Sequence, residues 1–243
     1  MPRCHVGIDY PELSPYYLRD DYVREDLREN QTGTTLYLDI GVIDITTCTP
    51  AQDIFVEIWA CSAQGVYSAF GSGPTMGGNS TALPTGSSGT IVPPSQTMSG
   101  PFPSGSGFPP GGFPGGGTSK ADGDNFLRGG LPADTNGMVE LMTIYPGFYT
   151  GRTVHIHTMI HQNISYHNNG TIISASGNLR HIGQVFFDEA LNDEVLAQAA
   201  YQGTGQSRTY NAQDGILEQA NSGGYSAFAE VERLGDSLDE GLL

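Results

Sequence analysis

The 243-residue sequence predicts an all-β protein, a β-sandwich or barrel, with one short helix. Its 34 glycines and 15 prolines, together with only 15% charged residues, are typical of a chain rich in turns. Apolar and polar residues alternate in several short segments separated by turn residues, which is the pattern of strands with one buried face. We expect one domain over residues 1–243, because the part before residue 71 supplies only about two or three strands, too few for a stable sheet.

The first predicted strand shows the alternation most clearly. Leu36, Leu38 and Ile40 lie two positions apart and so share one face. The alternation then shifts phase beside Gly41, which indicates a bulge. The same pattern recurs along the chain, and the segments predicted as strands are 34–42, 53–61, 138–145, 152–161, 169–175 and 181–187.

Three further segments depart from the strand pattern. The segment 192–201 predicts a helix, with Asn192 as N-cap and acidic residues in the first turn. Residues 71–124 are rich in Gly, Pro and Ser, and their few apolar side chains cannot offset the entropy lost on ordering. We expect a long disordered insert there, within the domain. Residues 214–243 are acidic with few apolar side chains, and we expect them to wrap the surface.

The charge of the chain excludes two classes of partner. The formal net charge is -16, and Lys120 is the only lysine. Such a polyanion repels nucleic acid and acidic membrane surfaces, so we expect neither as a partner. No apolar run is long enough to span a bilayer. The oligomeric state is not indicated.

The cysteines and sequons bear on the compartment. Cys48 and Cys61 end consecutive β-like segments, so a disulfide between them is plausible, with Cys4 left over. Alternatively, all three are reduced thiols of a cytosolic protein. Asn-x-Ser/Thr sequons favour a secreted glycoprotein, and they begin at Asn30, Asn79, Asn163 and Asn169. No signal peptide begins at Met1, so we expect a mature or trimmed form.

Two histidines on one predicted strand form a candidate metal site. His155 and His157 share a strand face, about 6.6 Å apart, and can reach one ion. Such a pair more often lies on a polar face in contact with solvent. His161 lies on the same face, about 13 Å further along, and we expect it at the surface or rim. His167, among asparagines, is expected in a loop.

The neighbouring residues narrow the choice of metal. No cysteine lies near the histidine pair in sequence, and no HExxH motif is present, although a zinc hydrolase using the pair stays an alternative. Tyr149 and Arg152 lie in the turn before the strand. Ferric iron is the common metal that favours phenolate oxygen together with imidazole. Taken alone, Tyr149 fits better as a turn aromatic that packs on the sheet.

The motifs together resemble those of the intradiol ring-cleavage dioxygenases, most closely their secreted fungal branch. The resemblance covers nearly all of the chain except residues 71–124. It rests on the combination of "GVYS" and "PGFYTGRTVHIH", supported by "HIGQVFF" and "LGDSLDEGLL". It implies an intradiol-type β-sandwich. The turn before the histidine pair is shorter than in bacterial members of the family. Ala60 stands where many secreted relatives carry histidine, so one contact around the metal site is in doubt.

The resemblance also implies a set of site residues. In this family iron(III) is held by two tyrosinates and two histidines, which here are Tyr67, Tyr149, His155 and His157. Tyr149 is expected to leave the metal and accept a proton when the diol binds. Arg152 is expected to stabilise charge developing on the substrate, and Gln184 to form the active-site wall near the oxygen-binding side.

The implied function is an O2-dependent intradiol dioxygenase that cleaves catechol-type diols to cis,cis-muconate-type diacids, incorporating both oxygen atoms. Its partners would be a small aromatic diol and O2, and its cofactor Fe(3+). The alternative is a non-catalytic β-sandwich that binds or supports other molecules. All four ligand positions are filled, which favours the enzyme.

Overall fold

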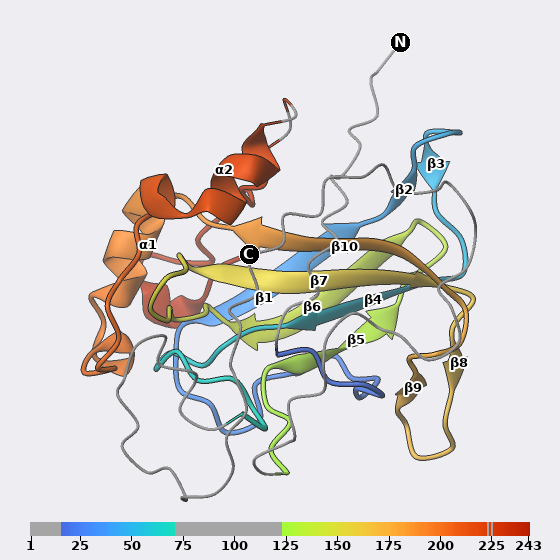
Figure 1. Ribbon diagram of the computed structural model, residues 1–243, viewed down its shortest axis with the longest axis horizontal. Coiled ribbons are helices and arrows are strands. Elements are labelled where there is room, and N and C mark those ends of the chain that lie inside the picture. The colour runs from blue at the N-terminus through green and yellow to red at the C-terminus, as the bar shows by residue number, and fades with distance from the viewer. Residues whose placement is uncertain (1–15, 71–122, 223, 225) are drawn as a thin grey trace, which may run out of the picture.

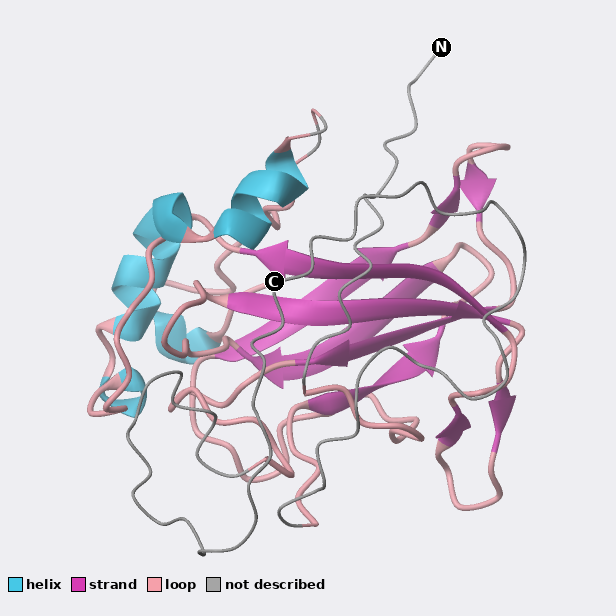
Figure 2. Cartoon of the chain, viewed as in Figure 1, coloured by secondary structure: helices cyan, strands magenta, loops and turns pink. Residues whose placement is uncertain are grey.

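The computed structural model describes residues 16–70, 123–222, 224 and 226–243. Most of the expected insert, as well as Cys4 and Asn79, lies outside these residues. The described part consists mainly of strands, with two α-helices at one end (Figure 1 and Figure 2). This agrees with the predicted β-rich class.

A four-stranded antiparallel sheet runs through the molecule. Its strand order is β10-β7-β4-β5. The bounds are Asn178–Phe186 for β10, His155–Gln162 for β7, Ile54–Trp59 for β4 and Arg128–Pro132 for β5. The central strand β7 places His157 opposite Trp59 on one side and opposite Gln184 on the other.

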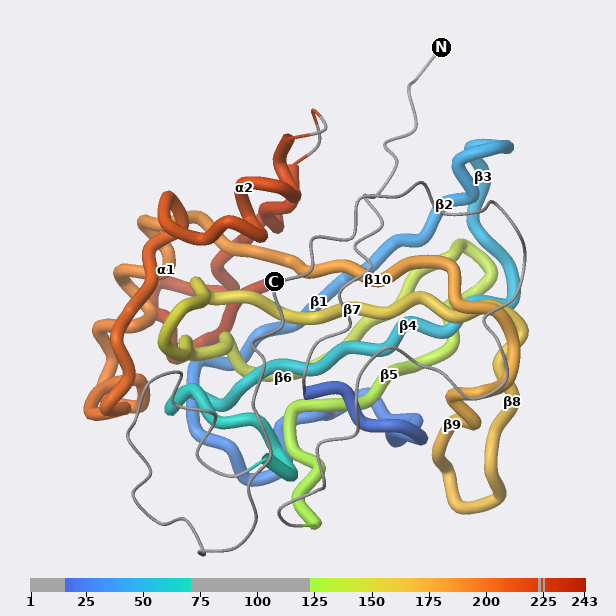
Figure 3. Tube along the Cα trace, in the orientation of Figure 1, coloured from blue at the N-terminus to red at the C-terminus, as the bar shows by residue number. Residues whose placement is uncertain are grey.

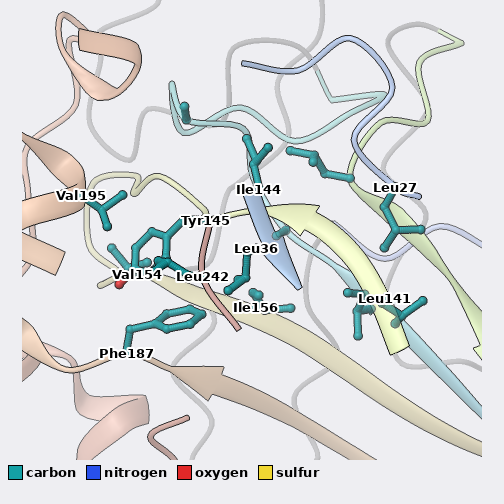
Figure 4. Close-up of a cluster of buried hydrophobic side chains, with 14 of the residues drawn as sticks. Leu27, Leu36, Leu141, Ile144, Tyr145, Val154, Ile156, Phe187, Val195 and Leu242 are labelled. Atoms are coloured by element: carbon teal, nitrogen blue, oxygen red, sulfur yellow. The ribbon is translucent and has the colours of Figure 1, made fainter. Parts of the chain in front are cut away.

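A second sheet packs against the first. Strands β1 (Thr35–Gly41) and β6 (Met138–Ile144) pair along their full length. Their buried side chains join those of β4 and β7 in one hydrophobic core, part of which Figure 4 shows. Leu36 and Leu141 come from the second sheet, and Ile156 comes from the first. The two apolar faces therefore meet as in a sandwich.

Two short hairpins extend the fold at the end of the sheet away from the helices (Figure 3). One consists of β2 (Ile43–Asp44) and β3 (Thr49–Pro50), and the other of β8 (Ser165–Tyr166) and β9 (Ile172–Ile173). The first hairpin begins where the alternation was expected to shift phase, immediately beyond Gly41.

The prediction of a single helix is wrong. Helix α1 spans Glu189–Leu196 and helix α2 spans Gly215–Asn221. The N-cap of α1 is Asp188, whose side chain accepts from the amide of Ala190. Asn192 is instead buried inside the helix, where it accepts a hydrogen bond of 2.7 Å from the Tyr145 hydroxyl. Neither helix of the described residues has the length and apolar character that crossing a membrane requires.

Three 3₁₀ turns complete the helical elements, at Ala199–Tyr201, Asn211–Gln213 and Leu238–Glu240. The first of them occupies the end of the segment predicted as one helix over 192–201. The chain leaves the α-helix at Ala197, two residues before this turn begins.

The C-terminal segment is more than the surface wrap that its acidity predicts. Asp214 is buried and caps α2. Leu242 is fully buried in the core, where its amide donates to the carbonyl of Thr35 and its carbonyl accepts from the amide of Tyr37. Its apolar side chain and these backbone bonds outweigh the charge of the surrounding residues.

The predicted disulfide between Cys48 and Cys61 is also wrong. Cys48 is disulfide-bonded, whereas Cys61 is a free thiol. Cys48 is exposed in the turn of the β2–β3 hairpin. Cys61 follows β4 and is buried in an aromatic cluster with Trp59 and Tyr67, where burial raises the pKa of its thiol to about 12. The two side chains therefore belong to different environments.

Candidate metal centre

Four side chains with metal-binding atoms meet where β7 begins, at the end of the sheet from which β10 leads into α1. Tyr67 comes from the loop after β4, Tyr149 from the turn before β7, and His155 and His157 from β7 itself. The Nε2 atom of His155 lies 3.2 Å from Nε2 of His157, 3.4 Å from the Tyr149 hydroxyl and 3.5 Å from the Tyr67 hydroxyl. All four predicted ligands are thus brought together.

A glycine allows the two tyrosine loops to touch. Gly65, in the "GVYS" segment, has φ 76°, a left-handed conformation that glycine adopts without steric cost. A Cβ at this position would lie 2.1 Å from the carbonyl oxygen of Phe148, the residue before Tyr149. The turn of Tyr149 is closed by a hydrogen bond of 3.1 Å from the Arg152 amide to the Tyr149 carbonyl. The spacing of the two tyrosines therefore depends on close backbone contact.

The histidines are in the form that binds a metal. Nδ1 of His155 lies 2.6 Å from the carbonyl oxygen of Thr153, and since a carbonyl only accepts, Nδ1 is the donor. The Nε2 atom of His155 consequently presents its lone pair to the other three residues. Burial, followed by the charge of Arg152, lowers the pKa of His155 to about 3, and burial also lowers the pKa of His157. Both rings are neutral at pH 7.

The donor atoms fit a small, highly charged cation. Two atoms bound at about 2.1 Å to one ion and about 90–110° apart lie about 3.0–3.4 Å from each other, close to the contacts of 3.2–3.5 Å around His155. Burial raises the pKa of both phenols, Tyr67 and Tyr149, so ionising them requires a strong positive charge nearby. Two phenolates and two neutral imidazoles suit ferric iron.

The same residues do not make a zinc site of the usual kind. In the part of the chain that the structure describes, no three His, Cys, Asp or Glu side chains gather closely enough to hold a metal. Among the described residues, the side chains beside His155 and His157 that could complete a centre are the two tyrosines. This observation disfavours the zinc hydrolase alternative.

Aromatic stacking fixes the orientation of two of the rings. The indole of Trp59 stacks on the imidazole of His157, with centroids 5.0 Å apart and planes within 9°. Tyr16 stacks on Tyr67, with centroids 4.1 Å apart, and meets Tyr149 edge to face at 5.7 Å. Neither contact was predicted from the sequence. The register that sets Trp59 opposite His157 becomes visible only once the strands are paired.

Arg152 is held beside the centre by two partners. Its Nε donates to Asp214 at 2.9 Å, and its Nη2 donates to the side-chain oxygen of Gln184 at 2.5 Å. Asp214 also accepts from the amide of Thr153 at 2.8 Å. Although burial opposes ionisation of Asp214, Arg152 and the amides of Thr153 and Leu217 keep the pKa of its carboxyl below the ordinary value. Arg152 and Gln184, predicted as active-site residues, are therefore in direct contact.

Asp214 is a site residue that sequence analysis missed. Its second carboxylate oxygen accepts from the amides of Ile216 and Leu217 and so caps α2. An aspartate just before a helical segment is a recognisable N-cap signal. Nothing in the local sequence, however, indicates that the same carboxylate reaches Arg152, 62 residues away.

The prediction that His161 lies at the surface is wrong. His161 is buried, and its Nε2 lies 2.7 Å from a carboxylate oxygen of the equally buried Glu57. The sheet face that carries the histidines is covered by other parts of the chain, and the Tyr17 hydroxyl lies 3.5 Å from Glu57. His167 is exposed in the loop between β8 and β9, as predicted.

The sequence matches no protein-family model and no curated protein. The structure, in contrast, is similar to an intradiol ring-cleavage dioxygenase from Tetranychus urticae, with a TM-score of 0.69 and 26% identity over 98% of this chain and 90% of that chain. A second solved structure, a crystal structure of a dioxygenase, gives a TM-score of 0.67 at the same identity and coverage. The fold is also that of the dioxygenase domain of a carbohydrate-binding fusion protein from Streptomyces sp. SirexAA-E, at 17% identity, a TM-score of 0.50 and coverage of 97% and 92%.

The two dioxygenase structures at 26% identity match this chain over almost its whole length. In addition, the tyrosines and histidines of the "GVYS" and "YTGRTVHIH" motifs meet at one point of the fold. On these grounds the chain is a dioxygenase enzyme, and its fold and its tyrosine and histidine motifs are similar to those of the intradiol ring-cleavage dioxygenases.

Proposed function

We propose that this enzyme binds one ferric ion and uses O2 to cleave catechol-type aromatic diols between their two hydroxylated carbons, giving cis,cis-muconate-type diacids. The observation that carries the proposal is that two phenol oxygens and the Nε2 atom of His157 all lie 3.2–3.5 Å from Nε2 of His155. The similar structure from Tetranychus urticae is that of an intradiol ring-cleavage dioxygenase, which supports the reaction class.

The four ligands divide into a fixed and a movable part. When bound, ferric iron would draw electron density from a chelating diol and make its ring reactive toward O2. Tyr67 is fully buried under Tyr16, and the histidines are fixed within β7. Tyr149 is only half-buried and lies on a turn, so it is the ligand best placed to leave.

Tyr149 is also suited to take up a proton. Burial raises the pKa of its phenol well above the ordinary value, even though Arg152 opposes this effect. A raised pKa means that the phenolate, once released from a cation, is a strong base. It would therefore accept a proton at its phenolic oxygen from an incoming diol.

Arg152 would supply fixed positive charge near the bound diol. A guanidinium stays protonated at any working pH, and here Asp214 and Gln184 hold it in one orientation. Preorganised charge of this kind stabilises negative charge that develops during a reaction, because no reorganisation is needed at that moment. Gln184 would then act by positioning Arg152 and by forming part of the site wall.

Iron quantitation combined with oxygen uptake tests the proposal. The purified protein, loaded with ferric ion, should hold one iron per chain, absorb visible light through tyrosinate-to-iron charge transfer, and consume O2 with at least one member of a catechol panel. A protein that binds iron and shows the band but consumes no O2 would support the non-catalytic alternative. A colourless protein that stays iron-free after loading would contradict both the cofactor and the activity.

We also propose that the protein is secreted and glycosylated. Of the sequon asparagines, Asn30, Asn163 and Asn169 are exposed and therefore accessible to modification. The bonded state of Cys48 is compatible with an oxidising compartment. Mass spectrometry of the native protein before and after glycosidase treatment tests the proposal, and an unchanged mass would contradict it.

A further inference from the structure

A cavity of about 610 Å³ lies on the side of β7 opposite the metal centre. Its walls include Ile58, Ile156 and Val185 from the four-stranded sheet, and Leu38 and Ile40 from β1. Ile156 alternates with His155 and His157 along β7, so the cavity and the centre use opposite faces of the same strand. Its volume is within the range of small-molecule sites.

One buried polar atom in the cavity wall lacks a partner. The hydroxyl oxygen of Thr158 forms no hydrogen bond within the described structure, and only 8% of the residue is exposed. Thr158 lines the cavity between apolar neighbours. A buried hydroxyl without a partner is costly, so a polar group of a ligand placed there would recover a hydrogen bond.

The charged side chains that line the cavity all have one sign. They are Asp39, Glu230 and Glu232, which are exposed and make no ion pair with a residue that the structure describes. No arginine or lysine is part of the described lining. The charge therefore favours a cationic ligand and opposes an anionic one.

We propose that this cavity binds an apolar small molecule that carries a protonated amine at one end and a hydrogen-bonding group at the other. The apolar body would lie between the sheets, the amine among the three carboxylates, and the other polar group near Thr158. This site lies on the other face of β7 from the metal centre, and Gln184 lies at the border between the two. The proposal does not depend on iron or on the proposed ring cleavage.

A matched series of ligands tests the proposal by calorimetry on the full chain, with and without iron. Amino-octanol carries both polar groups, octylamine lacks the hydroxyl, octanediol lacks the amine, and hydroxyoctanoate replaces the amine by an anion. We expect amino-octanol to bind most tightly and hydroxyoctanoate most weakly. Absence of binding by the two amines, or equal binding of the anion, would overturn the proposal.

Two kinds of variant separate the contributions. Glu230→Gln combined with Glu232→Gln should weaken amino-octanol by about twofold to fivefold for each carboxylate and leave octanediol unchanged. Thr158→Val, which is close in shape, should weaken amino-octanol roughly three- to tenfold and leave octylamine unchanged. If both variants bind the whole series like the native chain, the ligands bind elsewhere and the assignment is wrong.

Discussion

Replacing Gly65 by alanine perturbs the contact between the two tyrosine loops. A Cβ at this position lies 2.1 Å from the carbonyl oxygen of Phe148, and φ is 76°. Alanine in this left-handed conformation costs about 1–2 kcal/mol. The close contact with backbone adds roughly 1–3 kcal/mol, as overpacking does elsewhere. Gly65→Ala should therefore lower the free energy of unfolding by about 2–5 kcal/mol.

The chain offers a matched control at Gly203. This glycine has the same φ of 76°, but a Cβ there meets nothing within 4 Å. Gly203→Ala should cost only the conformational part, about 1–2 kcal/mol. The difference between the two variants, about 1–3 kcal/mol, then measures the contact between the "GVYS" loop and the turn of Tyr149.

Urea denaturation of the metal-free proteins gives the free energies, and ferric titration gives the functional consequence. Because Phe148 precedes Tyr149, a shift of its carbonyl changes the position of Tyr149 relative to His155. Gly65→Ala should bind iron more weakly than the native chain, whereas Gly203→Ala should bind it equally well. If the two variants lose the same stability and both bind iron like the native chain, the loop contact does not position the ligand.

Three further predictions concern Arg152 and Asp214. Arg152→Ala should retain iron, while kcat for a catechol falls by a factor of about 10²–10³, as it does when a charge-stabilising donor is lost. Loss of iron would contradict the proposed role of Arg152 in stabilising charge on the substrate. Asp214→Asn keeps the shape of the side chain but should lower kcat about tenfold, because one hydrogen bond to the guanidinium is worth about 1.5 kcal/mol. An unchanged kcat in folded protein would show that Arg152 needs no such support. Because the pKa of Asp214 is lowered in the folded chain, its contribution to stability is present above the ordinary value of 3.8 and is lost as the pH falls below it. Unfolding at pH 5 and pH 3 should then show a smaller loss for Asp214→Asn than for the native chain, and equal losses would refute the assignment.

The sequence predicts much of the sheet because its strands have one polar and one apolar face. The alternation of Leu36, Leu38 and Ile40 corresponds to β1. The predicted strand 138–145 agrees with β6 within one residue at each end, and the predicted strand 53–61 agrees with β4 within two residues. Strand β5, with two glycines in five residues, has no alternation to detect. Gly130 is needed there because a Cβ would lie 2.0 Å from the carbonyl oxygen of Val56.

The four side chains that meet at the candidate site could be predicted from the sequence, whereas the contacts that support them could not. The residues Tyr67, Tyr149, His155 and His157 stand within recognisable motifs. Their supports are contacts between distant segments, such as Asp214 with Arg152 and Tyr16 with Tyr67. The error at His161 has the same origin: alternation shows which face a side chain is on, and the burial of that face depends on segments far away in the sequence.

The central claim is that Tyr67 and Tyr149 both bind ferric iron as phenolates. Resonance Raman spectroscopy with excitation in the visible band of the iron-loaded protein tests it most directly. We predict tyrosinate vibrations in the native chain, and a shifted, weaker band with one tyrosinate remaining in Tyr67→Phe, while Tyr37→Phe, at an exposed tyrosine of β1, leaves the spectrum unchanged. An iron-loaded protein without tyrosinate vibrations, or a Tyr67→Phe spectrum identical to that of the native chain, would contradict the account.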